Sequence, residues 1–179
     1  MNFKRVCARV ALASTGLLAI ANAAVAATAI GTFPVTATVN NTCTVSSAAG
    51  VAFGAYAGAA LTGTGTITLS CNKGVTVSSL FLGDGANVGT ANQKRMLGAV
   101  GEYLNYNIDV PTGATLTTCP AAGTNEWNAT GAPTGAELTT LFATTGGAKT
   151  IAICGSVPAG QFPQSGAYAD TITMTLTYN

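Results

Sequence analysis

The residues with the best-defined chemistry in this chain are its cysteines. Of the five, Cys7 lies in a predicted export leader, which leaves an even set downstream: Cys43, Cys71, Cys119 and Cys154. In an oxidising compartment such a set predicts disulfides, and four cysteines allow three pairings. We favour Cys43 with Cys71 and Cys119 with Cys154, because each pair closes a local loop of about 30 residues, which stabilises a fold by roughly 3–4 kcal/mol. A zinc site built from all four thiolates is the alternative, but the paired C-x2-4-C spacings usual in structural zinc sites are missing.

Catalytic chemistry is hard to build from the other residues, because the sequence contains no histidine. Histidine is the commonest general base and metal ligand, so Ser-His-Asp and Cys-His arrangements are excluded together with histidine-ligated metals. The acidic residues are few and scattered, and the sequence gives no sign of the carboxylate pair that a glycosidase needs. We therefore expect no catalytic residues, no metal site and no cofactor, and we predict that the protein is not an enzyme.

Two smaller features resemble binding sites only superficially. Residues 83–85, Gly-Asp-Gly, lack the regularly spaced carboxylates of a calcium loop, so a tight turn is the better interpretation. Three aromatic residues are compatible with a ligand site on an adhesive tip, but aromatic residues are scarce here and packing in the core or in loops is the better interpretation; these residues are Tyr56, Tyr103 and Trp127.

The N-terminal residues have the three parts of a secretory signal peptide. An apolar run over residues 10–20 is followed by small residues that offer an Ala-x-Ala cleavage site after Ala26, and it is preceded by the basic residues Lys4, Arg5 and Arg9. A membrane anchor is the alternative, but about 20 continuous apolar residues are needed to span a bilayer and this run is shorter. We predict a signal peptide over residues 1–26.

Loss of the leader leaves four basic and six acidic side chains, a net charge of −2. So few cations cannot neutralise a run of phosphates, which argues against nucleic acid and against anionic membrane surfaces as partners. No later apolar run is long enough to span a bilayer, so we expect no membrane insertion. The remaining length fits one domain.

Apolar and polar residues alternate at a period of two in several segments. The pattern is clearest over residues 171–178, and it recurs over residues 104–110 and 67–71. Residues 134–143 are compatible with a short helix or with another strand. Shorter strand candidates are residues 51–53, 75–82 and 150–154. Many short, half-buried strands separated by Gly-rich and Pro-containing turns predict an all-β fold of two packed antiparallel sheets.

A further alternating segment follows the predicted cleavage site, and its apolar positions are Phe33, Val35, Ala37 and Val39. Pro34 has no backbone N–H to donate, which places the segment at a sheet edge or at a strand start. It is either the first strand of a self-contained sandwich or a donor strand laid into the open sheet of a neighbour. The C-terminal strand favours the donor interpretation, since it ends the sequence at Asn179 with an apolar face and a backbone edge that need a partner.

The order and spacing of these segments resemble the spore coat protein U family, which includes pilins of the archaic chaperone-usher class. The resemblance runs through nearly the whole mature chain. Its marks are an alternating strand before Cys43, VAFGAY at 51–56, TITLSC at 66–71, RML at 95–97, LNYNI at 104–108, a lone Trp127, and GAYADTITMTLTY at 166–178.

This resemblance implies an incomplete immunoglobulin-like β-sandwich of the pilin type, which lacks its last strand and is completed by donor-strand exchange. Residues 27–41 are then a donor-strand extension and residues 42–179 the pilin domain. The implied partners are a periplasmic chaperone, an outer-membrane usher and other pilin subunits, and the implied location is a cell-surface pilus that supports adhesion and biofilm formation. A family disulfide between the first two strands maps onto Cys43 and Cys71, whereas Cys119 and Cys154 fit the family pattern less clearly.

In that scheme the donor strand fills successive pockets of the neighbour with Phe33, Val35, Ala37 and Val39. A register shifted by two residues is the alternative, with Ile30 as an additional anchor. The acceptor groove is bordered by an edge strand that carries Ile172, Met174, Leu176 and Tyr178. The three largest donor side chains, at about 1.5–3 kcal/mol each, contribute roughly 5–9 kcal/mol before ordering costs. A head-to-tail joint of this kind does not close on itself, so repetition gives a filament.

Two other functions remain compatible with the sequence. One is a receptor-binding module at a fibre tip, although the chain has room for neither a second domain nor a long aromatic loop. The other is a secreted coat protein that completes its own fold and forms no fibre.

Overall fold

The computed structural model describes residues 26–128 and 135–179, so the predicted leader lies almost wholly outside the described residues. The chain divides into two units, residues 1–38 and residues 39–179. Residues 26–42 contain no helix or strand, and all of them are exposed. The strand that the alternation predicts over residues 33–39 is therefore not present in this structure.

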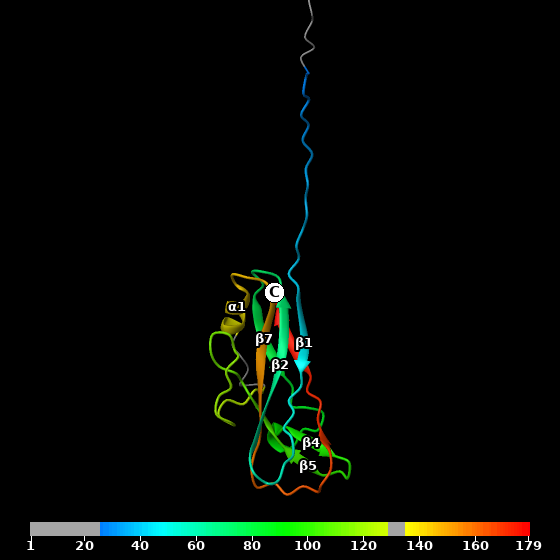
Figure 1. Ribbon diagram of the computed structural model, residues 1–179, viewed down its shortest axis with the longest axis vertical. Helices are drawn as coiled ribbons and strands as arrows, with labels where there is room; N and C mark the ends of the chain where they lie inside the picture. The colour runs from blue at the N-terminus through cyan, green and yellow to red at the C-terminus, as the bar shows by residue number, and fades with distance from the viewer. Residues whose placement is uncertain (1–25, 129–134) are drawn as a thin grey trace, which may run out of the picture. The chain divides into compact units, whose positions relative to one another are not determined.

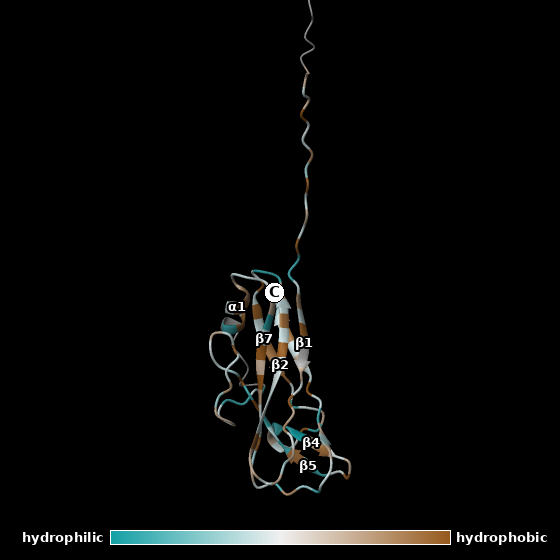
Figure 2. Cartoon of the chain, in the orientation of Figure 1, coloured by the Kyte–Doolittle hydropathy of each residue, from teal (hydrophilic) through white to brown (hydrophobic). Residues whose placement is uncertain are grey.

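The larger sheet has four antiparallel strands in the order β1-β2-β7-β6 (Figure 1). Their bounds are Cys43–Ala49 for β1, Leu61–Cys71 for β2, Gly147–Val157 for β7 and Asn107–Asp109 for β6. β2 and β7 pair along their full length, from Leu61 opposite Val157 to Cys71 opposite Gly147. Figure 2 shows hydrophobic and more hydrophilic residues alternating along these two strands, as a half-buried sheet requires.

Two smaller sheets complete the β-structure. One pairs β3 with β9 and the other has the order β5-β4-β8. The bounds are Val77–Leu82 for β3, Met174–Tyr178 for β9, Tyr103–Asn105 for β5, Arg95–Gly98 for β4 and Tyr168–Ala169 for β8, with a 3₁₀ turn at Thr90–Asn92. The predicted strand over residues 104–110 is thus two strands, because the chain passes at Tyr106 from the sheet of β4 to the sheet of β7.

The segment that sequence left open between helix and strand is the helix α1, Gly135–Phe142. Leu138 and Phe142, four residues apart, are fully buried. Spacing of this kind puts both side chains on one helical face. The hydroxyl of Thr139 donates to the carbonyl of Val77 over 3.0 Å, which fastens the helix to β3.

The core lies between the sheets and draws its members from alternate strand positions, from α1 and from the segment between β6 and α1. Trp127 is fully buried, and its indole N–H donates to the carbonyl of Leu80 over 3.0 Å, so its one polar atom is paired. The other fully buried apolar side chains include Ile67, Leu69, Leu80, Leu82, Leu116 and Ile151. Tyr103, in contrast, is partly exposed, and its ring lies 3.7 Å from the guanidinium carbon of Arg95.

One fully buried cation fixes the loop after β3. The Nζ atom of Lys94 lies 3.4 Å from an Asp84 carboxylate oxygen and 3.8 Å from one of Glu126. A buried ammonium needs such partners, because isolated burial of charge is costly. Asp84 therefore forms an ion pair. Across residues 26–128 and 135–179, no group of three or more acidic, histidine or cysteine side chains is placed to hold a metal ion.

Both favoured cysteine pairings are disulfides in the structure. Cys43–Cys71 joins the start of β1 to the end of β2, and Cys119–Cys154 joins the loop after β6 to the buried middle of β7, with Cα–Cα distances of 4.1 Å and 5.4 Å. The first disulfide therefore secures the strand that follows the N-terminal extension.

The strands of the 39–179 unit run between two ends of the domain, the terminal end and the far end. At the terminal end β1 begins and β9 stops: the Asn72 amide donates to the Thr42 carbonyl, and Thr76 and Asn179 exchange backbone hydrogen bonds. At the far end lie the β1–β2 loop, the β4–β5 turn and the loop over residues 158–167 (Figure 1). None of the helices in the described residues is long and apolar enough to cross a bilayer.

Candidate functional site: a groove beside the last strand

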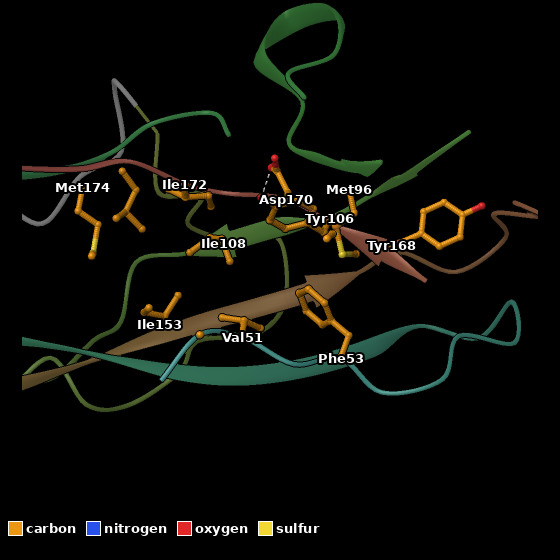
Figure 3. Close-up of a pocket in the computed structure, with 13 residues that line it drawn as sticks. Val51, Phe53, Met96, Tyr106, Ile108, Ile153, Tyr168, Asp170, Ile172 and Met174 are labelled. Atoms are coloured by element: carbon orange, nitrogen blue, oxygen red, sulfur yellow. Dashed lines mark hydrogen bonds between the residues drawn. The ribbon is translucent and has the colours of Figure 1, made fainter. Parts of the chain in front are cut away.

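An open groove of about 350 Å³ lies along the segment that leads into β9. Figure 3 shows side chains from opposite sides of this space pointing into it, with Ile172 and Met174 on one side and Val51 and Phe53 on the other. The remaining lining residues are Gly50, Leu82, Met96, Tyr106, Ile108, Ile153, Tyr168, Ala169 and Asp170. The lining is mostly apolar, and Asp170 is its only charged member, so the groove suits an apolar occupant.

The first wall belongs to an unfinished sheet edge. β9 pairs with β3, from Val77 opposite Tyr178 to Leu82 opposite Met174, and within the described part of the chain no strand pairs with its other edge. Along β9 the threonines are exposed and the apolar side chains are half-buried against the core. An edge of this kind presents unpaired backbone groups beside an apolar face, which is what an added strand uses.

The second wall is the chain that follows β1, and it can lie there because three strand positions lack side chains. An ideal Cβ on Gly155 of β7 would stand 2.6 Å from Val51 Cγ1 and 2.8 Å from the Phe53 ring. On β2, a Cβ on Gly63 would stand 2.9 Å from Val51 Cγ1, and one on Gly65 would stand 2.7 Å from the Ala49 carbonyl oxygen. Glycine at these positions therefore leaves a flat strip of sheet on which Val51 and Phe53 rest.

A part-buried polar pair fixes the segment between β8 and β9. The Tyr106 hydroxyl donates to Asp170 Oδ2 over 2.7 Å, and Asp170 Oδ1 accepts from the Ala86 amide at 2.9 Å and from Asn87 Nδ2 at 3.1 Å. Burial, and then the hydrogen bond to Asp170 and its charge, raise the pKa of Tyr106 far above its ordinary value. The hydroxyl therefore stays protonated at neutral pH and keeps donating to Asp170.

The structure places the expected acceptor residues on one side of β9 and its lead-in. Ile172 and Met174 line the groove, whereas Leu176 and Tyr178 continue the same apolar face toward the terminal end without lining that space. The expected donor residues lie in exposed, irregular chain: Ile30 is 90% exposed, Phe33 81%, Val35 83% and Val39 79%, and Ala37 is exposed as well.

Sequence reasoning missed the second wall and the polar pair. Residues 51–53 alternate like a strand, but in the structure they belong to none. The signal that points to them is the pair of glycines two residues apart, Gly63 and Gly65, which alternate with threonines in β2, since such spacing empties one face of the strand. Asp170 is the one acidic residue next to the alternating C-terminal strand, a position that suits a structural hydrogen-bonding role.

The Spore Coat Protein U domain model matches residues 29–175. The chain belongs to this family. Among solved structures it is similar to a chain in the crystal structure of the CsuC–CsuE chaperone–tip adhesion subunit pre-assembly complex, from the archaic chaperone-usher Csu pili of Acinetobacter baumannii. That match has a TM-score of 0.51 at 20% identity and covers 78% of this chain and 40% of the other, so this chain spans less than half of the length of that relative. No curated protein sequence matches significantly.

Together these findings confirm the predicted fold class. This member of the spore coat protein U family is an all-β, immunoglobulin-like fold with open sheets. The resemblance recognised from the sequence marks is confirmed as well, since the family model spans most of the chain.

Proposed function

We propose that this protein is a structural subunit of a chaperone-usher surface pilus, in which the groove beside β9 accepts the N-terminal extension of the next subunit. The observation that carries the proposal is the coexistence, in one chain, of an apolar groove beside an unpaired strand edge and an extension with exposed, alternating apolar side chains. Each supplies what the other lacks, since an inserted strand covers apolar surface and pairs the free backbone groups.

The direction of the chain favours completion between molecules. β9 ends and β1 begins at the same end of the domain. A strand made of the residues just before β1 in the same molecule would therefore run toward that end, parallel to β9. The extension of a neighbour is free to run antiparallel, which continues the antiparallel pattern of this sheet and is the slightly more stable pairing. Self-completion, as a non-fibrous coat protein requires, is thus the less favoured arrangement.

Partners and location follow from the same proposal. A subunit with an open groove needs a temporary cover before assembly, and a periplasmic chaperone supplies it; an outer-membrane usher and other pilin subunits complete the set, with the fibre on the cell surface. A role of this kind needs no catalytic residue. Adhesion and biofilm formation are the expected consequences of displaying such a fibre, and a receptor-binding role at the tip is the second candidate function.

A variant with the donor moved to the other end of the chain tests the proposal. Residues 27–39 are deleted and residues 27–41 are appended after Asn179 through a short Gly-rich turn, so that the appended segment can run antiparallel to β9. We expect this tethered monomer to have a free energy of unfolding that exceeds that of the truncated chain by roughly 5–9 kcal/mol, less the cost of ordering the donor, because three large side chains become buried. Denaturant unfolding and size-exclusion chromatography measure this.

The matched control carries aspartate in place of Phe33 and Val35 in the appended segment, and it should behave like the truncated chain. If the truncated chain without a donor is as stable as the tethered one and stays monomeric, the groove is not an acceptor site and the proposal is wrong. Electron microscopy of the untruncated mature chain gives the independent readout, since fibres should form only when residues 27–39 are present.

A further inference from the structure

The loop over residues 158–167, here called the Phe162 loop, holds the most exposed aromatic ring of the domain. Phe162 is 90% exposed at the far end. Single exposed apolar residues are ordinary, but this end also exposes several others: Leu97 at 38%, Val100 at 59% and Tyr103 at 42%. The far end therefore carries a cluster of apolar side chains that the fold itself does not cover.

The Phe162 loop is held rigidly by its neighbours. The side chain of Gln161 accepts from the Asn105 amide at 2.8 Å and donates to the Asn105 carbonyl at 3.0 Å, as a strand residue would. The Tyr56 hydroxyl donates to the Pro158 carbonyl at 2.8 Å and accepts from the Gln161 amide at 3.0 Å. A rigid loop loses little conformational entropy on binding, so the ring beside Gln161 is preorganised for contact.

The loop is continuous with the acceptor groove. A second hollow of about 800 Å³ is lined by Phe162 and shares four residues with the groove, namely Val51, Phe53, Met96 and Tyr168. A donor strand antiparallel to β9 runs toward the far end, so its last residues leave the groove through this hollow and pass beside Phe162.

The length of the connection then places the neighbouring molecule. If the donor ends at Val39, three residues remain before Cys43, and three extended residues span at most roughly 10 Å. Cys43 is tied to Cys71 by a disulfide at the terminal end. The terminal end of the donating subunit must therefore lie against the far end of the accepting subunit, where the Phe162 loop stands.

We propose that the Phe162 loop is a second contact between neighbouring subunits and docks on the terminal end of the copy of this chain that donates the strand; the proposal rests on the pilus function proposed above. The terminal end offers an open hollow of about 540 Å³, whose lining includes Thr42, Asn72, Lys73, Gly146 and Gly147. Lys73 is exposed at this end, and Glu102, which is exposed at the far end, accepts from the Gln164 amide of the Phe162 loop at 2.5 Å. The proposed contact brings these opposite charges, one from each subunit, to the same interface.

A contact of this kind sets the stiffness of the joint. The donor strand alone leaves a connection of three residues about which two domains can bend. The Phe162 ring seated on the neighbour adds a second point of attachment and restrains that bending. Strand exchange and joint stiffness are therefore separable properties of the fibre.

Fibres of two matched variants test this proposal by electron microscopy. Phe162→Ser removes the apolar contact and Phe162→Leu retains it, and neither affects folding because the side chain is exposed. We expect both variants to form fibres of wild-type abundance, with the persistence length of the Phe162→Ser fibre reduced at least twofold and that of Phe162→Leu nearly unchanged. Loss of fibres in both variants would contradict a contact that affects stiffness alone. The tethered monomer described above shows separately whether strand exchange itself fails.

A benzophenone amino acid at position 162 supplies the second measurement. After illumination of fibres, mass spectrometry should find cross-links to a neighbour's residues 72–74 or 146–147, and none in the tethered monomer. The same label at the exposed Thr117 is the control. Unchanged persistence length in Phe162→Ser, or cross-links elsewhere on the neighbour, would overturn the proposal. If the Phe162→Ser fibre also no longer binds hydrophobic surfaces, the loop serves adhesion instead.

Discussion

β7 and β9 each pair antiparallel with their neighbours, and they differ in how many of their edges are paired. β7 lies between β2 and β6 and pairs with β2 over all eleven of its residues. β9 pairs with β3 on one edge, and nothing in residues 26–128 and 135–179 pairs with the other. Ile151 in β7 is fully buried, whereas Leu176 in β9 is half-buried.

The difference shows that an alternating sequence identifies which face of a strand is apolar. The sequence pattern does not identify the element that covers this face. In β7 the covering elements belong to the same chain, so the strand contributes to a finished core. In β9 the same pattern ends at an edge whose apolar face is only partly covered, which in a single molecule is a hazard of aggregation. The strand exchange proposed above would give that edge a use.

The largest effect is expected from the donor side chains in the tethered monomer. Phe33→Ala should lower the free energy of unfolding by about 3–5 kcal/mol, because a buried aromatic ring is lost. Ile30 lies an odd number of residues from Phe33, so in an unbroken strand it faces the other way, and Ile30→Ala should cost less than about 1 kcal/mol. Equal losses in denaturant unfolding would mean that the donor contains a bulge near Gly31.

Alanine substitutions in β7 and in β9, each made in the truncated chain and in the tethered monomer, sharpen the contrast between the two strands. Ile151→Ala should cost about 2–5 kcal/mol in the truncated chain and in the tethered monomer alike, because its surroundings are complete in both. Leu176→Ala should cost about 1 kcal/mol without a donor and more than twice that with one. Denaturant titration of the four variants measures these values. A Leu176→Ala penalty that does not depend on the donor would mean that β9 is not the strand being completed.

Removal of the Asp170 carboxylate should weaken the groove wall without touching β7. Asp170→Ala deletes the acceptor of three hydrogen bonds and leaves the Tyr106 hydroxyl buried without its partner. We expect a loss of roughly 2–3 kcal/mol in unfolding free energy. Hydrogen exchange should rise in residues 83–87 and 168–174 and stay unchanged in β2 and β7, and a uniform rise would contradict a local role.

The smallest effect concerns alkaline pH. The folded state raises the pKa of Tyr106 above its ordinary value of 10.0, chiefly through burial. The unfolded chain therefore releases this proton first, so the stabilisation is complete below about pH 10 and is lost as the pH rises further. Tyr106→Phe should cost about 1 kcal/mol at pH 8 and should flatten the decline in unfolding free energy above pH 10 relative to wild type. Parallel curves for the two proteins would show that another group dominates there.

Much of this architecture follows from sequence because it is local. Alternation locates β3 and β9 and a part of β2 and of β7, and cysteine spacing favours the two disulfides that the structure contains. The break at Tyr106 does not follow, since the residues on both sides of it alternate as one strand and only tertiary pairing divides them. The resting place of Val51 and Phe53 also depends on glycines that lie about ten residues away in sequence or, for Gly155, on a strand much further along the chain.

Gly63, Gly65 and Gly155 influence the width of the groove beside β9, because they have no side chains on the face of the sheet where Val51 and Phe53 lie. A methyl group at Gly155 would meet Val51 and Phe53 at less than 3 Å and drive them toward Met174 on the opposite side. Homologues that carry alanine or serine at these positions should accept slimmer donor side chains than phenylalanine. Under the strand exchange proposed above, compatibility between subunits depends partly on these missing side chains, and replacement of glycine by alanine would be a route by which related fibres become unable to mix.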